Sequence, residues 1–386
     1  MALNFTLLTD KQIWGDGKGN EPLDVMKKYG TSVAPTDLAI LLGCHMSDQD
    51  NRTSEGDLTC ASWSASSNKD GLVRFVANDG HLYWHTPVLR GISTRPVLSP
   101  EQTVKIPSST TTKSINDVDI TLYGEYPQTV VDTQTNNKME ELFYSQALKT
   151  TGKIYSFDSV YANKETPFRR ASYAEYEYNG QKYIRVKGRY SSSTTKLSSG
   201  EWVMDERPYW VRVEPIEWLK DPTGTWVSKK CLFAGIQFDT NRSYDGDFSK
   251  TFMKKYLDTY FAKEIETPEM VADREKLVKR QETIKGLKAK LAEAIDPDKV
   301  KATVGFTRTE SRREIAEAIK TTRRARDVFV AAGKKAQKEG DQELIEQIVE
   351  MADFYVRSDQ AQRGAARQRR AEYRAKRTAA KKDSGR

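Results

Sequence analysis

Alternating apolar and polar residues in the first hundred positions predict a short β-hairpin. Two strand-like runs, Leu72–Val76 and His81–Trp84, are joined by the turn sequence Asn78-Asp79-Gly80. An Asp-Gly pair between β-rich runs favours a hairpin, because glycine supplies the positive φ that the turn requires at little cost. Side chains alternate between the two faces of a strand. In the second run, one face carries Leu82 and Trp84, and the other carries His81, Tyr83 and His85. We expect one face to anchor in a core and the other to display polar side chains.

A second β-rich region extends from position 119 to position 265. It begins with a strand over 120–128 and contains a clear hairpin signal, in which Glu175–Tyr178 and Lys182–Val186 flank Asn179-Gly180. Two aromatic strands are predicted at Tyr209–Trp218 and Thr225–Ala234. Apolar side chains then recur at helical spacing between 248 and 265, which predicts a helix with one buried face.

The region from 266 to 357 has a helical pattern. Thr267 followed by Pro268 predicts a helix start, with threonine as the cap and proline in the first helical position. Apolar residues then recur every seven positions, which is coiled-coil-like spacing over about three heptads. Further helices are predicted from about 309, ending near Gly333, and from about 340. We favour a helical bundle over a parallel oligomeric coiled coil.

Length and composition set the expected domain boundaries. A chain of 386 residues is long enough for two or three domains. Residues 99–118 are rich in Ser, Thr and Lys and predict a linker with little core content. The expected parts are therefore 1–98, the linker 99–118, 119–265, a helical region 266–357 and a tail 358–386. No run of about 18 apolar residues predicts a membrane span. The first residues lack the basic region of a signal peptide, so we expect synthesis in the cytoplasm.

The cysteines indicate a reducing compartment. Cys44, Cys60 and Cys231 are too few and too scattered for a disulfide scaffold. We predict buried free thiols, with pairing of Cys44 and Cys60 as the alternative. Three cysteines without a disulfide scaffold fit the cytoplasm, or a virion assembled in the cytoplasm.

The positive charge is concentrated in the tail. The chain carries a formal net charge of +8. Residues 358–386 hold ten Lys or Arg against three acidic residues, giving 10 − 3 = +7, so the rest of the chain carries about +1. Such a segment either contacts the phosphates of a nucleic acid or another polyanion, or is a solvated extension. The candidate contacts are Arg363, Arg367, Arg369, Arg370, Arg374, Lys376, Arg377, Lys381 and Lys382.

Motifs that carry enzymatic chemistry are missing from the sequence. There is no Gly-rich phosphate loop before a helix, no His-Glu-x-x-His and no Cys-x-x-Cys. The acidic stretch 45–57 does not follow the EF-hand order, so we interpret it as a solvated loop rather than a calcium site. We therefore expect no catalytic residues, no metal and no cofactor.

Two sets of motifs resemble a known domain class. Trp-Ser-Ala-Ser-Ser from Trp63, Val-Arg-Phe-Val from Val73 and the Gly-x-x-x-Arg-Pro-Val-Leu ending at Leu98 resemble the C-terminal half of a C-type-lectin-like domain. The closest versions are formylglycine-generating-enzyme-like folds and the variable proteins of diversity-generating retroelements in gut bacteria and phages. Tyr-Gly-Glu-Tyr-Pro-Gln from Tyr123 and Trp-Val-Arg-Val-Glu-Pro-Ile-Glu-Trp ending at Trp218 resemble the N-terminal half.

The resemblance implies an α+β fold, with a lectin-like mixed domain of antiparallel hairpins followed by an α-helical region. The two halves stand in reversed order, so 1–98 and 119–265 form either two incomplete copies or one composite domain with permuted connectivity. The class's formylglycine-generating activity does not carry over, because the sequence offers no clear match to its active-site cysteines.

The resemblance also implies a recognition surface on the first hairpin. In the variable proteins this segment carries diversified polar positions on a constant scaffold. The matching candidates are Asn68, Asp70, Asn78, His81, Tyr83, His85 and Thr86, with the surface extending to Arg90. Trp63, Trp84, Arg95 and Pro96 are expected to be scaffold. The alternative is an ordinary solvated hairpin whose polar face has no ligand.

These expectations lead to two functional hypotheses. The first is a non-enzymatic binder of a protein or glycan, whose helical region serves oligomerisation or docking on a larger assembly such as a virion. The second is a phage or virion structural protein whose basic tail binds nucleic acid or an acidic partner.

Overall fold

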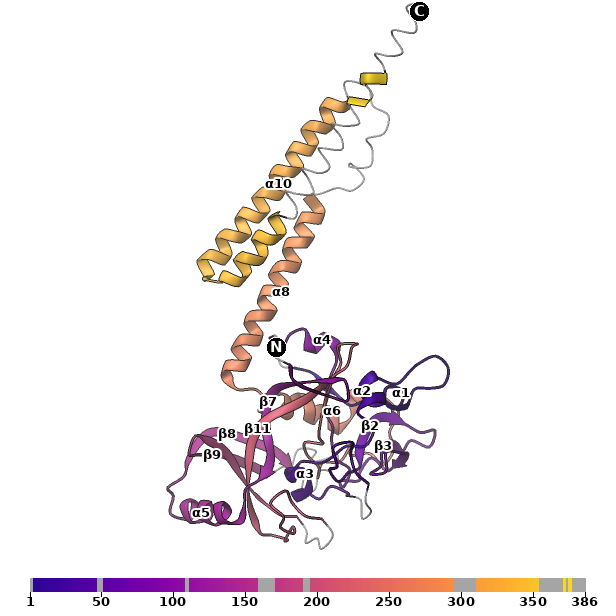
Figure 1. The fold of residues 1–386 in the computed structure, drawn as a ribbon, viewed down its shortest axis with the longest axis vertical. Helices are drawn as coiled ribbons and strands as arrows, with labels where there is room; N and C mark the ends of the chain where they lie inside the picture. The colour runs from indigo at the N-terminus through magenta and orange to yellow at the C-terminus, as the bar shows by residue number, and fades with distance from the viewer. Residues whose placement is uncertain are drawn as a thin grey trace, which may run out of the picture. The chain divides into compact units, whose positions relative to one another are not determined.

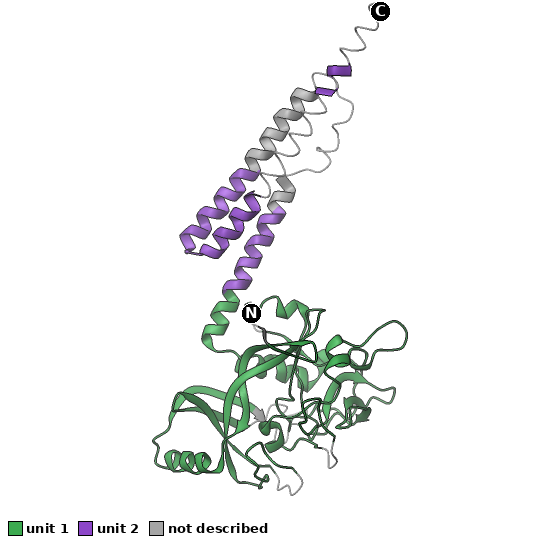
Figure 2. Cartoon of the chain, in the orientation of Figure 1, with its two compact units in different colours: residues 1–275 green, residues 276–386 purple. Residues whose placement is uncertain are grey.

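The computed structural model describes residues 3–46, 51–107, 111–158, 171–189, 195–294, 310–353, 371–372 and 374–376. The chain divides into two compact units, Met1–Glu275 and Lys276–Arg386 (Figure 2). The first unit is a mixed α+β structure with antiparallel sheets, and the second is helical.

The larger sheet of unit 1 contains nine strands among the described residues. Along its main path the order is β1, β5, β12, β11, β10, β9 and β8, while β7 pairs with β11 and with β6. The strands are β1 (Phe5–Thr6), β5 (Val97–Leu98), β6 (Thr111–Ile115), β7 (Val118–Val130), β8 (Lys149–Asp158), β9 (Ala171–Tyr178), β10 (Gln181–Lys187), β11 (Pro208–Lys220) and β12 (Trp226–Ser228).

Several predicted strands of the second region are confirmed. The Asn-Gly hairpin is β9–β10, in which Tyr178 pairs with Gln181 and Asn179 adopts a φ of 51°. The two aromatic runs contain β11 and β12, which pair with each other. Strand β5 from the first region pairs with both β1 and β12, so residues 1–98 and 119–265 contribute to one sheet.

The predicted linker 99–118 is wrong, because these residues belong to the folded unit. Helix α4 (Pro100–Thr103) follows β5, and β6 lies in the sheet beside β7. Ile106 and Val118 are buried at 5% and 3% exposure. The polar composition of this segment predicted a linker. A few buried apolar side chains at isolated positions are nevertheless enough to fix it to the core.

Short helices cover parts of unit 1. They are α1 (Asp10–Trp14), α2 (Asp24–Lys28), α3 (Asp37–Leu41) and α5 (Thr133–Tyr144). Helix α5 packs on the β9–β11 part of the sheet through Met139 and Phe143, which contact Trp210 and Tyr176 (Figure 1). This side of unit 1 lies away from β2 and β3 (Figure 1).

The helix predicted over 248–265 is present as four consecutive short elements. They are η1 (Phe248–Lys250), α6 (Phe252–Tyr256), η2 (Leu257–Phe261) and α7 (Ala262–Glu264). The Thr251 hydroxyl caps α6 by accepting the Lys254 N–H at 3.1 Å. Phe261 then packs on Phe5 and Tyr126 at ring-centroid distances of 4.9 and 5.2 Å. The predicted apolar face therefore closes the aromatic core of unit 1.

Unit 2 is built from helices that pack against one another. Helix α8 (Pro268–Ala294) starts in unit 1, where the Thr267 hydroxyl accepts the Met270 N–H at 3.3 Å, as predicted. Helix α10 (Glu310–Glu339) continues through Gly333, so the predicted stop there is wrong, and the helix ends before Gly340 at a φ of 68°. A further helical stretch covers 342–353. Among the described residues of unit 2, the buried apolar side chains are Leu287, Ala325, Phe329, Ala336, Leu344 and Ile348.

Candidate binding site on the β3–β4 hairpin

The predicted hairpin is confirmed as β3 (Val73–Val76) and β4 (Leu82–His85). The Gly80 N–H donates to the Ala77 carbonyl at 3.0 Å, and Gly80 has a φ of 82°. The Ala77 N–H then donates to the His81 carbonyl at 2.9 Å, which starts the ladder between the strands. The Asp79 carboxylate accepts the His81 N–H at 3.0 Å and so fixes the turn.

A third strand connects the hairpin to the core. Strand β2 (Ser62–Ser67) pairs with β3, giving a three-stranded sheet in the order β2-β3-β4. One face carries a row of aromatic rings that runs outward from Trp63 through Phe75 to Tyr83, with centroid distances of 6.2 and 6.1 Å. Trp63 is 2% exposed and Tyr83 is 48% exposed. The row therefore links a buried anchor to an exposed rim.

The expected scaffold role of Trp84 is wrong. Its side chain is 55% exposed, and it lies on β4, the terminal strand of its sheet. Trp63, Arg95 and Pro96 are buried as expected. The Arg95 Nε donates to the Ser228 carbonyl at 2.8 Å, joining this region to β12.

The base of the hairpin is held by polar contacts. Arg74 on β3 forms an ion pair with Asp10, whose carboxylate also accepts the Ser66 hydroxyl at 2.6 Å. The Tyr244 N–H donates to the Gly71 carbonyl at 2.7 Å, and the Tyr244 hydroxyl donates to the Ala65 carbonyl at 2.7 Å. Burial raises the pKa of this hydroxyl above its usual value, so it remains a donor in alkaline solution as well as at neutral pH.

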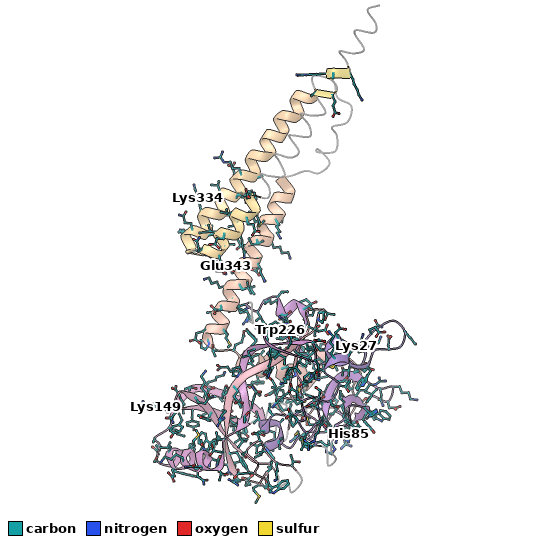
Figure 3. The ribbon with its side chains drawn as sticks, in the orientation of Figure 1. Lys27, His85, Lys149, Trp226, Lys334 and Glu343 are labelled. Carbon is teal, nitrogen blue, oxygen red and sulfur yellow. The ribbon has the colours of Figure 1, made fainter. Side chains whose placement is uncertain are left out.

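The structure brings three candidates together and gives others local structural roles. His81, Tyr83 and His85 lie exposed along β4, and Figure 3 labels His85. Asn68 is half-buried and its side chain accepts the N–H groups of Asp70 and Leu72 at 3.0 and 2.9 Å, so it shapes the preceding turn.

The remaining hairpin candidates differ in exposure. Asp70 is exposed, whereas the others are half-buried. The Asn78 carbonyl accepts the Thr59 hydroxyl, and the Arg90 carbonyl accepts the Gly235 N–H at 3.0 Å. The Thr86 hydroxyl has no hydrogen-bond partner among the described residues. The exposure of Trp84 is a feature of the hairpin that the sequence pattern does not predict.

Most of the candidate tail residues lie outside the described residues. These are Arg363, Arg367, Arg369, Arg370, Arg377, Lys381 and Lys382. Arg374 and Lys376 are exposed in short helical segments.

The cysteines and acidic residues of the described ranges form no metal-binding group. Cys44, Cys60 and Cys231 are buried free thiols, as predicted. Within the described ranges, no set of three or more His, Cys, Asp or Glu side chains could hold a metal ion. In the acidic stretch 45–57, Glu55 pairs with Lys229 at 2.8 Å, and Asp48 and Asp50 lie outside the described residues.

Comparison of the chain with protein-family models, with curated proteins and with solved structures finds no match. None of the helices in the described part of the chain is long and apolar enough to cross a membrane.

Proposed function

We propose that this chain is a non-enzymatic ligand-binding protein, in which residues 1–275 form a C-type-lectin-like scaffold that displays the β3–β4 hairpin to a protein or glycan. The observation that carries the proposal is the exposure of Tyr83 and Trp84, at 48% and 55%, on the rim of a sheet anchored in the core. The two side chains lie on opposite faces of β4, so an aromatic ring is exposed on each side of the strand. Exposed aromatic side chains are typical of binding surfaces, because they bury a large apolar area on contact and lose little conformational entropy.

The rigidity of the hairpin supports this role. Its register is regular over all four cross-strand pairs, and the Trp63–Phe75–Tyr83 row ties the rim to the core. A surface held in this way loses little freedom when a ligand binds, which preserves more of the contact energy as affinity. The exposed His81 and His85 add hydrogen-bonding groups on the Tyr83 face.

The resemblance to variable proteins extends the proposal to diversification of this surface. A near-repeat of the DNA encoding 63–98, with adenines in the codons of Asn68, His81, Tyr83 and His85 and a reverse transcriptase gene beside it, is the expected genomic arrangement. A genome without such a repeat contradicts diversification and leaves a binder of fixed specificity.

In this proposal, unit 2 serves oligomerisation or docking on a larger assembly. Several copies of the chain then bind together, and their weak single contacts add up through avidity.

Two binding screens with matched variants test the proposal. The full chain is applied to a glycan array and to a phage library of random twelve-residue peptides. The double variant Tyr83→Ala/Trp84→Ala is compared with Tyr144→Ala/Trp202→Ala, which removes one tyrosine and one tryptophan that are 73% and 41% exposed elsewhere on unit 1. We expect at least a tenfold loss of affinity for the hairpin variant and less than a threefold loss for the control. Equal effects of the two variants would contradict the proposal.

The charge of the tail supports a second candidate function, that of a phage or virion structural protein binding nucleic acid or an acidic partner through 358–386. Ten basic residues against three acidic ones give the segment a net +7 of the chain's +8. Binding through phosphate contacts weakens steeply as salt rises. Retention on DNA at low salt that disappears when 358–386 is deleted is the expected result, and indifference of the full chain to DNA at low salt would refute it.

A further inference from the structure

The outer edge of β4 is an unpaired row of backbone groups. In an antiparallel ladder, successive residues of a strand direct their N–H and C=O groups alternately toward and away from the neighbouring strand. The ladder starts with the Ala77 N–H donating to the His81 carbonyl, so Tyr83 and His85 face β3, and Leu82 and Trp84 face outward. No described residue forms a backbone hydrogen bond with this outward side, since β4 ends its sheet.

The opposite edge of the same sheet is covered. The Trp63 N–H on β2 donates to the Ser93 carbonyl at 3.0 Å, and the Ala65 N–H donates to the Leu8 carbonyl at 2.8 Å. Only the β4 side of this sheet therefore has a free edge within the described ranges.

Strand β4 has only one of the features that usually protect an edge, its short length of four residues. Exposed edges are commonly blocked by a very short strand, lysine, proline, a bulge or an inward charge. The terminal strand of the larger sheet, β8, has such features, with Lys149, Lys153 and two register shifts against β9. By contrast, β4 has the sequence Leu-Tyr-Trp-His and a regular register. A short sheet edge with exposed aromatic side chains and no lysine, proline or bulge is suited to accept a short added strand.

The chemistry of the edge selects an extended polypeptide as its occupant. Outward N–H and C=O groups alternating along a strand match the backbone of a peptide, and Trp84 and Tyr83 can contact alternate side chains on its two faces. The cation on β3 is already compensated, because the Arg74 guanidinium pairs with the Asp10 carboxylate. A charged occupant would lose hydration without gaining a counter-charge, so an uncharged segment fits best.

A second copy of this chain fits the edge less well. Four residues of strand span about 13 Å. The surface buried by pairing over so short a strand falls well short of the about 1,200 Å² that a stable interface between two proteins buries. A short peptide segment needs no more than this edge, and several copies of the chain could hold a partner through several such contacts.

We propose that β4 takes up an extended, uncharged segment of a partner protein as a fourth strand of the β2-β3-β4 sheet. This inference rests on the proposed binding role of the hairpin and names the ligand class. A glycan ligand would use the same aromatic side chains without needing the outward backbone groups.

The test changes one backbone donor on the protein. Leu82→Pro removes the outward N–H and leaves the pairing with β3 intact, because proline is tolerated on edge strands where its nitrogen faces solvent. Leu82→Ala is the matched control, since it shortens the side chain and keeps the N–H. For the tightest peptide from the phage library, we expect Leu82→Pro to weaken binding about tenfold and Leu82→Ala to weaken it less than threefold, because the peptide carbonyl loses its donor.

A second arm changes the peptide and leaves the protein as it is, so it decides the question even where Leu82→Pro fails to fold. N-methylation of alternate amides that face β4 should abolish binding, and methylation of the intervening amides should preserve it. Peptide binding that is insensitive to both Leu82→Pro and N-methylation, or binding to glycans alone, would overturn strand addition while leaving the hairpin as the binding surface. Binding that survives Tyr83→Ala/Trp84→Ala would overturn the proposed function itself.

Discussion

A buried ion pair at the start of α8 provides the sharpest stability prediction. The Arg274 guanidinium donates to both carboxylate oxygens of Glu266, at 2.6 and 3.0 Å, and the Tyr123 hydroxyl donates to the same carboxylate at 2.5 Å. The side chains of Glu266 and Arg274 are each 2% exposed. This pair connects the first turns of α8 to strand β7 inside unit 1.

The cost of breaking this pair follows from its burial. Arg274→Ala leaves the Glu266 carboxylate in the interior without its counter-charge, which costs about 3–5 kcal/mol of unfolding free energy. For a unit of this size each kcal/mol corresponds to about 2–4 °C, so the melting temperature of unit 1 should fall by about 6–20 °C. Lys250→Ala is the matched control, because its ion pair with Asp247 is exposed, with side-chain exposures of 70% and 41%, and should contribute little.

A double variant separates the desolvation penalty from simple loss of contacts. Glu266→Leu/Arg274→Met replaces both charges with apolar side chains of similar size, and such replacements are often neutral or stabilising. It should therefore be more stable than Arg274→Ala, measured by thermal and urea unfolding followed by circular dichroism. A double variant that is less stable than the single one would refute the reasoning, as would equal melting temperatures for Arg274→Ala and Lys250→Ala.

Three further predictions concern the turn, the tyrosines and the cysteines. Gly80→Ala should lower the free energy of unfolding by about 1–2 kcal/mol, measured by urea unfolding. The reason is that the φ of residue 80 is 82° and the new Cβ would lie 2.8 Å from the Ser32 hydroxyl oxygen. Unchanged stability would contradict the turn geometry. Burial raises the pKa of Tyr29 and of Tyr173 from 10.0 to about 12. Both are protonated in the folded state over a range where the unfolded chain ionises, so their contribution to stability should be constant below about pH 10 and fall between pH 10 and 12. A flat stability profile across that range would argue against these buried hydroxyls. The three buried thiols should react with a thiol reagent only at the rate of unfolding, and rapid labelling of the native protein would contradict their burial.

Local chemistry explains which elements could be predicted from the sequence. The two hairpins follow from turns at Asn78-Asp79-Gly80 and Asn179-Gly180, where glycine conformations fix the geometry within a few residues. The start of α8 was similarly predictable from Thr267 and Pro268, since a helix cap is a contact between near neighbours in the chain.

Features that depend on distant partners could not be predicted. The exposure of Trp84 follows from the position of β4 at the end of its sheet, and no local pattern encodes strand order. The folding of 99–118 into unit 1 depends on whether Ile106 and Val118 find a core, which composition does not report. In the candidate site, Asn68 was expected to face a ligand, but its side chain accepts hydrogen bonds from its own turn, a role that asparagine plays as readily.

Amide hydrogen exchange with bound ligand tests most directly the claim that the β3–β4 hairpin is the binding surface. Exchange of the full chain is measured by NMR alone and with the tightest peptide or glycan from the two screens. We predict that ligand slows exchange in Leu82–His85, with a peptide ligand slowing Leu82 and Trp84 most because their amides face outward. Protection confined to other parts of the chain, with the amides of β4 unchanged at saturating ligand, would contradict it.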